Sequence, residues 1–363
     1  MSKEMNIRKI FPLIVLLSGI TGPPSFSQID SVNYQFAVSD TLDEDIKLFE
    51  SDELLEISLR FDITHYQRKR DDTEYLPAIL VYHTSPTDSV VKKLKVRGRG
   101  ISRLSICSFP PLMLNFQKKD SVEGEFRGVD KMKMVTHCST GREDYLLKEY
   151  LIYKLYNVLT DYSFRVRLLR VNYINTFKKS KPIRAFAFVI EPTESLCKRL
   201  NAVEVETRMN ISQKQIRPEV MDRMAIYQYM IGNTDWTVPI FHNNVLILSQ
   251  SYLHGQEQGI AVAYDFDYSG LVNAGYAVPA DHYNLNSVRE RRYIGICRSE
   301  ETFINALKEF ADKKEDFYRV INEFQYLSPS QKKQMISYLD GFYMGFDKRN
   351  SIVSALLNDC IDF

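Results

Sequence analysis

The feature that most constrains the fold is a change in hydrophobic period near residue 145. Before that point, residues 54–63 and 131–136 alternate apolar and polar side chains with a period of two. This alternation is typical of β-strands with one buried face. Further strands are predicted at residues 76–83, 90–96, 112–116, 165–173 and 183–190.

Helical spacing first occurs at residues 145–159, where apolar side chains recur every three or four positions between Lys and Glu. Beyond about residue 195 it dominates, interrupted by short apolar strands at 245–248 and 260–264. Helices are predicted at residues 194–200, 218–230, 301–324, 329–346 and 349–357.

We therefore expect an α+β protein with a β-rich N-terminal lobe, residues 28–192, that contains one embedded helix. A mainly helical C-terminal lobe, residues 193–363, follows it. Two lobes of this kind predict a cleft between them in which a ligand binds.

Residues 1–27 have the three parts of a secretory signal peptide. Lys3, Arg8 and Lys9 precede an apolar run at residues 10–20, and small residues flank Phe26. The run is much shorter than the roughly 20 residues that a transmembrane helix needs. A buried core segment is the alternative, but we expect an exported protein, periplasmic or extracellular, whose mature chain has no transmembrane span.

Composition limits the classes of partner. The 47 basic and 46 acidic residues nearly cancel, so nothing indicates nucleic-acid binding or a polybasic membrane patch. The five cysteines show neither a CxxC pair nor zinc spacing. In an oxidising compartment one disulfide can form, the odd number leaves at least one thiol over, and burial as unpaired residues is expected for most.

The densest polar cluster lies between residues 231 and 270. Asp235 follows a predicted helix in the sequence GNTDW, HNN precedes one short strand, and DFD follows the next. Antiparallel pairing of these two strands would bring Asn243 close to Asp265. Carboxylate and amide oxygens suit a hard cation such as Mg²⁺, and the remaining acid can accept a proton or orient a nucleophile. The candidate metal ligands are Asn243, Asn244, Asp265 and Asp267.

The order GNTDW, HNN and DFD resembles the catalytic core of kinase-like phosphotransferases. It is most similar to the atypical branch that contains the spore coat protein H-type kinases, the HipA-type kinases and the phosphatidylinositol kinases. This resemblance implies a two-lobed protein-kinase-like fold, with ATP and Mg²⁺ or Mn²⁺ as cofactors. It also implies that Asp235 is the catalytic base, that Asn243 or its neighbour Asn244 holds a metal, and that Asp265 is the principal metal-binding acid. For Asp267, a supporting role is as good an interpretation as metal contact.

The first half contains residues that fit the same resemblance. Arg97 and Arg99 alternate with glycines, followed by Arg103, as in a turn of the spore coat protein H-type proteins. Glycines let a backbone approach phosphates, and arginines add positive charge. The alternative is that these arginines are structural and pair with buried carboxylates.

Lys131 and Lys133 lie on one face of a predicted strand, just before the helix that carries Glu149. In kinases a strand lysine paired to a helix glutamate grips the phosphates of the nucleotide. Glu191 ends the strand at 183–190, where the resemblance places the hinge that meets adenine. The alternatives are a solvated strand face for the lysines and bonds to tyrosine hydroxyls for Glu149.

Two departures from the resemblance leave other functions open. The spacing of eight from Asp235 to Asn243 is longer than in the usual loop, and Asn115 stands where a lysine would. The leading hypothesis is ATP- and Mg²⁺-dependent phosphotransfer to a protein or small molecule outside the cytoplasm. The alternatives are a catalytically inactive kinase-fold binding or structural protein of the envelope, a metal-dependent hydrolase that uses Asp235, His242 and Asp265, and a set of turn and capping residues with no ligand.

Overall fold

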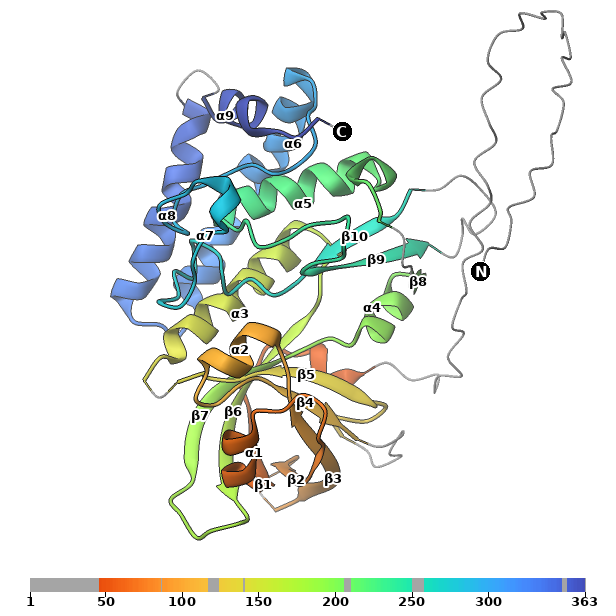
Figure 1. Ribbon diagram of the computed structural model, residues 1–363, viewed down its shortest axis with the longest axis vertical. Helices are drawn as coiled ribbons and strands as arrows, with labels where there is room; N and C mark the ends of the chain where they lie inside the picture. The colour runs from red at the N-terminus through yellow and green to blue at the C-terminus, as the bar shows by residue number, and fades with distance from the viewer. Residues whose placement is uncertain are drawn as a thin grey trace, which may run out of the picture. The chain divides into compact units, whose positions relative to one another are not determined.

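The computed structural model describes residues 46–362 apart from 86, 117–123, 140, 206–209, 250–257 and 348–350 (Figure 1). The predicted signal peptide, residues 1–27, lies outside the described residues. Within them, no helix combines the length and the apolar character that a membrane crossing requires.

The strands of the N-terminal half close into a seven-stranded barrel in the order β1-β2-β3-β4-β5-β7-β6. All neighbours pair antiparallel except β1 and β6, whose parallel pairing closes the barrel. The period-two pattern points alternate side chains inward, so Leu59, Leu80 and Leu114 are buried among aromatic rings. The strands are β1 (Leu55–Phe61), β2 (Leu76–His83), β3 (Ser89–Gly98), β4 (Leu112–Asn115), β5 (Lys131–Val135), β6 (Val166–Asn175) and β7 (Ile183–Ile190).

The barrel contradicts the predicted fold class. We expected a two-lobed protein-kinase-like fold, and the structure has instead a closed mixed β-barrel followed by helices. Each predicted strand is confirmed within one or two residues. The error lies in which strands pair with each other. Alternation identifies a strand and its buried face, but it does not predict the parallel pairing of β1 with β6, which is distant in the sequence.

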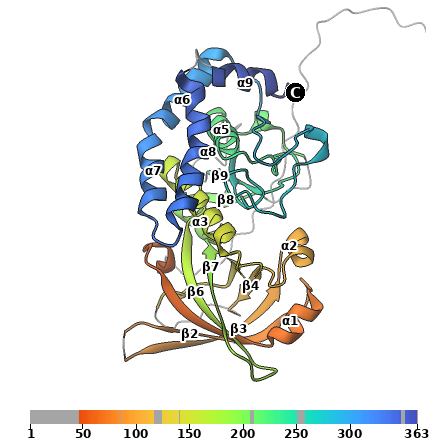
Figure 2. The same ribbon diagram turned by 90° about the vertical axis from the view of Figure 1, so that its left-hand side faces the viewer.

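Three helices interrupt the barrel strands. α1 (Ile63–Lys69) begins at Asp62, whose carboxylate accepts the backbone N–H of His65 at 2.8 Å. α2 (Ile101–Ile106) follows Gly100. Neither short helix was predicted, because one or two turns are too few to show a helical period. The predicted embedded helix is confirmed as α3 (Glu143–Leu159), which packs against β7 and α7 (Figure 2).

The C-terminal part is mainly helical, as predicted, and contains a small antiparallel sheet of order β10-β9-β8. The predicted helix at 301–324 is two helices that meet at Lys313. The elements are α4 (Thr193–Arg199), β8 (Ala202–Glu204), α5 (Pro218–Ile231), β9 (Asn244–Ser249), β10 (Ile260–Ala263), α6 (Glu300–Asp312), α7 (Lys314–Glu323), α8 (Pro329–Asp347) and α9 (Ser351–Asp359).

Aromatic packing fixes the segments that carry the candidate site. The rings of Tyr156 on α3 and Tyr227 on α5 stack with centroids 4.4 Å apart. Phe266, which follows β10, packs edge-on against Tyr153 of α3 at 4.8 Å. Because Phe266 separates Asp265 from Asp267, its burial holds both acids beside α3.

Two disulfides join Cys107 to Cys138 and Cys297 to Cys360. Cys197 is a buried free thiol, as the odd number of cysteines requires. The expectation that most cysteines are unpaired core residues is therefore wrong. Cys107 ends α2 and Cys138 follows β5, so the first disulfide ties the short helix to the barrel.

Candidate functional site

One arginine, Arg103 on α2, organises a buried cluster of three carboxylates. Its Nε donates to Asp267 Oδ2 at 2.9 Å, and its Nη2 donates to Asp265 Oδ1 at 2.8 Å. The same Nη2 lies 3.1 Å from both carboxylate oxygens of Glu149. We call these four residues the Arg103 cluster.

Three separate segments supply the cluster. Gly100, with a φ of 85°, makes the turn that starts α2 and places Arg103 inward. Glu149 comes from α3, and both aspartates follow β10. The backbone N–H of Asp265 donates to the Tyr153 hydroxyl at 2.8 Å, which holds this residue in a left-handed conformation with a φ of 63°.

The three acids differ in pKa, because burial and nearby positive charges act on them to different extents. Burial raises the pKa of Glu149 to about 8, against the opposing charge of Arg103. It also raises the pKa of Asp267, which accepts a hydrogen bond from the Tyr276 hydroxyl at 2.9 Å. Burial opposes ionisation of Asp265 too, but the charges of Arg103, Arg99, Lys133 and His242 together hold its pKa below the usual range. Asp265 is therefore the member most firmly ionised.

The three acids each offer an oxygen within 4.8 Å of the others, a spacing that could hold a metal ion. The guanidinium of Arg103, however, already satisfies all three. Only Asp265 reaches solvent, with its side chain 31% exposed, compared with 2% for Glu149 and 4% for Asp267. An incoming cation would therefore meet Asp265 first.

A second, more open cluster is centred on Asp235. Its Oδ1 lies 2.8 Å from His242 Nε2, and Asn243 Nδ2 donates to its Oδ2 at 3.1 Å and to its backbone oxygen at 2.6 Å. The Asp235 and His242 side chains are 39% and 49% exposed. We call these three residues the Asp235 cluster.

The predicted antiparallel pairing joins the two clusters. β9 and β10 pair, and the carbonyl oxygen of Asn243 accepts the N–H of Tyr264, next to Asp265, at 2.9 Å. The amide nitrogen of Asn243 donates hydrogen bonds to Asp235, so Oδ1 is the side-chain atom of Asn243 that could coordinate a cation. Asn244, by contrast, is buried and donates to the backbone oxygens of Thr237 and His242, so it stabilises the loop.

The two predicted lysines have different surroundings. Lys131 is exposed on β5, whereas Lys133 is half-buried and its Nζ lies 4.2 Å from the centroid of the Tyr264 ring. Burial and the charge of Arg99 lower the pKa of Lys133 to about 8, against the opposing charge of Asp265. The charges of Lys133 and Arg99 thus act on Asp265, while Glu149 pairs with Arg103 instead of a lysine.

Two predicted residues lie elsewhere. Arg97 donates to the backbone oxygen of Asp72, and its guanidinium lies over the Tyr75 ring at 5.3 Å. Glu191 accepts two hydrogen bonds from Arg199, at 2.9 and 3.1 Å, and one from a backbone N–H. These contacts hold the chain, and neither side chain joins the two clusters.

Arg103 is the functional candidate that sequence reasoning did not place. From the sequence it was named as an arginine after the glycine-rich turn, and pairing with buried carboxylates was an alternative for the arginines there, but the carboxylates were not named. The sequence holds one chemical signal for this role: a single arginine can satisfy several carboxylates at once.

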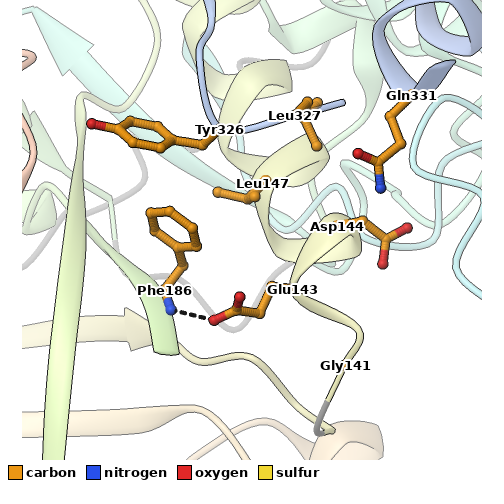
Figure 3. Close-up of a pocket in the computed structure, with 8 residues that line it drawn as sticks. All are labelled: Gly141, Glu143, Asp144, Leu147, Phe186, Tyr326, Leu327 and Gln331. Atoms are coloured by element: carbon orange, nitrogen blue, oxygen red, sulfur yellow. Dashed lines mark hydrogen bonds between the residues drawn. The ribbon is translucent and has the colours of Figure 1, made fainter. Parts of the chain in front are cut away.

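A cavity of about 240 Å³ lies at the start of α3 (Figure 3), and no residue of either cluster lines it. Glu143 and Asp144 line it, but both carboxylates have partners. Glu143 accepts the N–H of Phe186 at 2.6 Å, and Asp144 lies 3.4 Å from Lys148 Nζ. This cavity offers no unused charge for a ligand.

Comparison with known proteins gives distant similarity to solved structures alone. No protein-family profile matches the sequence, and no curated protein matches it. Among solved structures, the Helicobacter pylori proinflammatory kinase CtkA is similar with a TM-score of 0.39 and 11% identity, over 68% of this chain and 94% of that chain. A similarity this distant transfers neither fold nor activity.

Proposed function

We propose that this protein is an ATP- and Mg²⁺-dependent phosphotransferase that acts on a protein or small molecule outside the cytoplasm. The observation that carries the proposal is the environment of Asp265. This carboxylate is partly exposed, its pKa is held low chiefly by the charges of Arg103, Arg99 and Lys133 against the effect of burial, and it follows Tyr264, whose N–H bonds to Asn243. One carboxylate and one amide oxygen form a donor set that fits Mg²⁺.

In this proposal, Asp265 and Asn243 Oδ1 hold the metal, and Lys133 and Arg99 lie where they can attract phosphate oxygens. A metal ion bound there with ATP would neutralise the negative charge of the phosphates. Asp235 remains open to solvent, so it can accept the proton of an acceptor hydroxyl. Arg103 is a positioning residue, because it acts through Asp265 and touches no substrate.

Export is part of the proposal. The signal-peptide pattern of residues 1–27 supports it. The two disulfides support it as well, because disulfides persist in oxidising compartments outside the cytoplasm.

One observation favours a second candidate, a non-catalytic binding or structural protein of the envelope. The Arg103 guanidinium already neutralises the acids that a second metal ion would need. A protein that only binds a ligand would retain this cluster as a structural device.

A thermal-shift titration tests the proposal. The mature protein is titrated with ATP, with and without Mg²⁺ or Mn²⁺, beside Asp265→Ala and the control Asp161→Ala, an exposed acid elsewhere. A ligand at 100 times its Kd stabilises the native state by about 2.7 kcal/mol. We expect a metal-dependent shift that only Asp265→Ala abolishes; no shift with any nucleotide or metal would leave the binding or structural candidate.

A further inference from the structure

A second cavity, of about 460 Å³, lies where the end of the barrel meets α1. One wall is α1, and the other is formed by the adjoining ends of β6 and β7 and by the loop that joins them, in a hairpin that extends beyond the barrel (Figure 1). The two walls are fixed to each other, because Asn175 Nδ2 on β6 donates to Thr64 Oγ1 on α1 at 2.8 Å. The cavity is thus preformed, and its volume is that of a small-molecule site.

The wall of this cavity is positively charged. Arg68 from α1 and Lys178 and Lys181 from the hairpin line it, and no aspartate or glutamate does. None of these three side chains makes an ion pair with another residue in the described ranges. Residues 173–190 contain no acid, so this segment carries a local excess of positive charge. The near-zero net charge of the whole chain does not reveal it.

The nearest acids do not neutralise the three cations. Glu74 lies 3.1 Å from His65 and 3.5 Å from Lys69, and Asp62 caps the first turn of α1. Two further cations lie in the hairpin: Lys179, which does not line the cavity, and Arg184, which is paired with Glu56 at 2.8 Å. Arg68, Lys178 and Lys181 therefore hold unused charge around one preformed cavity.

We propose that this cavity binds a small phosphate monoester, either free or as the headgroup of a lipid. A dianionic phosphate has enough oxygens to accept bonds from all three cations, and the side chains of Thr64, Gln67 and Ser180 add polar groups to the wall. Ile63 and Ile183 supply an apolar surface for the ester group. This site is separate from the two clusters and does not depend on phosphotransfer.

Isothermal titration calorimetry of the mature protein with glycerol 3-phosphate, with glycerol as the neutral comparison, tests the free-ligand source. Cosedimentation with phosphatidylcholine vesicles that contain phosphatidic acid tests the lipid source. The variant is Lys178→Gln with Lys181→Gln. The matched control, Lys93→Gln with Lys95→Gln, removes the same charge from exposed positions on β3.

We expect binding of at least one phosphate probe, weakened about tenfold or more by the cavity variant and unchanged by the β3 control and by Asp265→Ala. The probe that binds identifies the source. Absence of binding to both probes, or equal weakening by the two lysine pairs, would overturn the proposal. Retained affinity in Asp265→Ala separates this site from the proposed nucleotide site, so either proposal can fail alone.

Discussion

The Arg103 cluster and the Asp235 cluster use similar residue types in opposite environments. In the first, Glu149 and Asp267 are almost fully buried and both contact the guanidinium of Arg103. In the second, Asp235 and His242 are open to solvent and bond to each other. The difference lies in burial: the acids of the Arg103 cluster are mostly closed off from solvent and hold three segments together, whereas solvent reaches Asp235 and His242. Asp265 belongs to the first cluster and faces the second.

The largest effect is expected from Arg103→Met. This change leaves three carboxylates in a buried site without their cation, which should lower the free energy of unfolding by about 3–5 kcal/mol. Urea denaturation followed by circular dichroism measures it. Arg103→Lys keeps the charge but loses the forked geometry, so its loss should be smaller. Equal stability of Arg103→Met and wild type would show that the buried acids do not need the Arg103 guanidinium, and the two clusters would then not differ in this respect.

Asp235→Asn should affect activity strongly and stability little, the reverse of what we expect for the stability of Arg103→Met. It retains the shape of the side chain and lies at an exposed position, so the free energy of unfolding should change by less than about 1 kcal/mol. If Asp235 is the proton acceptor, the rate of phosphate transfer or ATP turnover should fall about a hundredfold or more. Radiolabelled ATP measures the rate, and full activity in Asp235→Asn would exclude the role of base.

The raised pKa of Glu149 predicts a pH dependence of stability. The folded protein retains this proton up to about pH 8, whereas in the unfolded chain the group titrates near its ordinary value of 4.5. The contribution is therefore fully present below pH 4.5 and is lost as the pH rises towards 8. Asp267 acts in the same direction, so Glu149→Gln should reduce the slope and not abolish it.

Urea denaturation of wild type and Glu149→Gln at several pH values between 5 and about 8.5 measures this slope. Parallel pH profiles for the two proteins would show that Glu149 ionises normally. The cluster would then be more hydrated than its burial indicates.

The smallest expected effects are on the stability of variants of Asn243 and His242, the two hydrogen-bond partners of Asp235. Asn243→Ala removes two hydrogen bonds at a nearly buried position and should cost about 1–2 kcal/mol of stability. His242→Gln breaks only an exposed pair and should cost less than about 1 kcal/mol. Thermal denaturation of the two variants side by side ranks them. The reverse order would mean that His242, not Asn243, holds the loop.

The positions of most helices and strands could be predicted from the sequence, but the pairing of distant strands could not. All seven barrel strands were predicted, two of them from clear alternation, and the antiparallel pair β9–β10 followed from two short apolar runs beside Asn243 and Asp265. The parallel contact of β1 with β6 has no local signature, so the fold class was wrong. Arg103 was missed as the organiser of the site for the same reason, since its three partners come from segments far apart in the sequence.

The central claim is that Asp265 is the carboxylate through which a metal–nucleotide complex binds. Isothermal titration calorimetry with Mn²⁺ and ATP, on wild type, Asp265→Asn and Asp235→Asn, tests it most directly. The account predicts that Asp235→Asn binds as tightly as wild type and that Asp265→Asn loses affinity about a hundredfold or more. Equal binding by wild type and Asp265→Asn, with both variants folded, would contradict it.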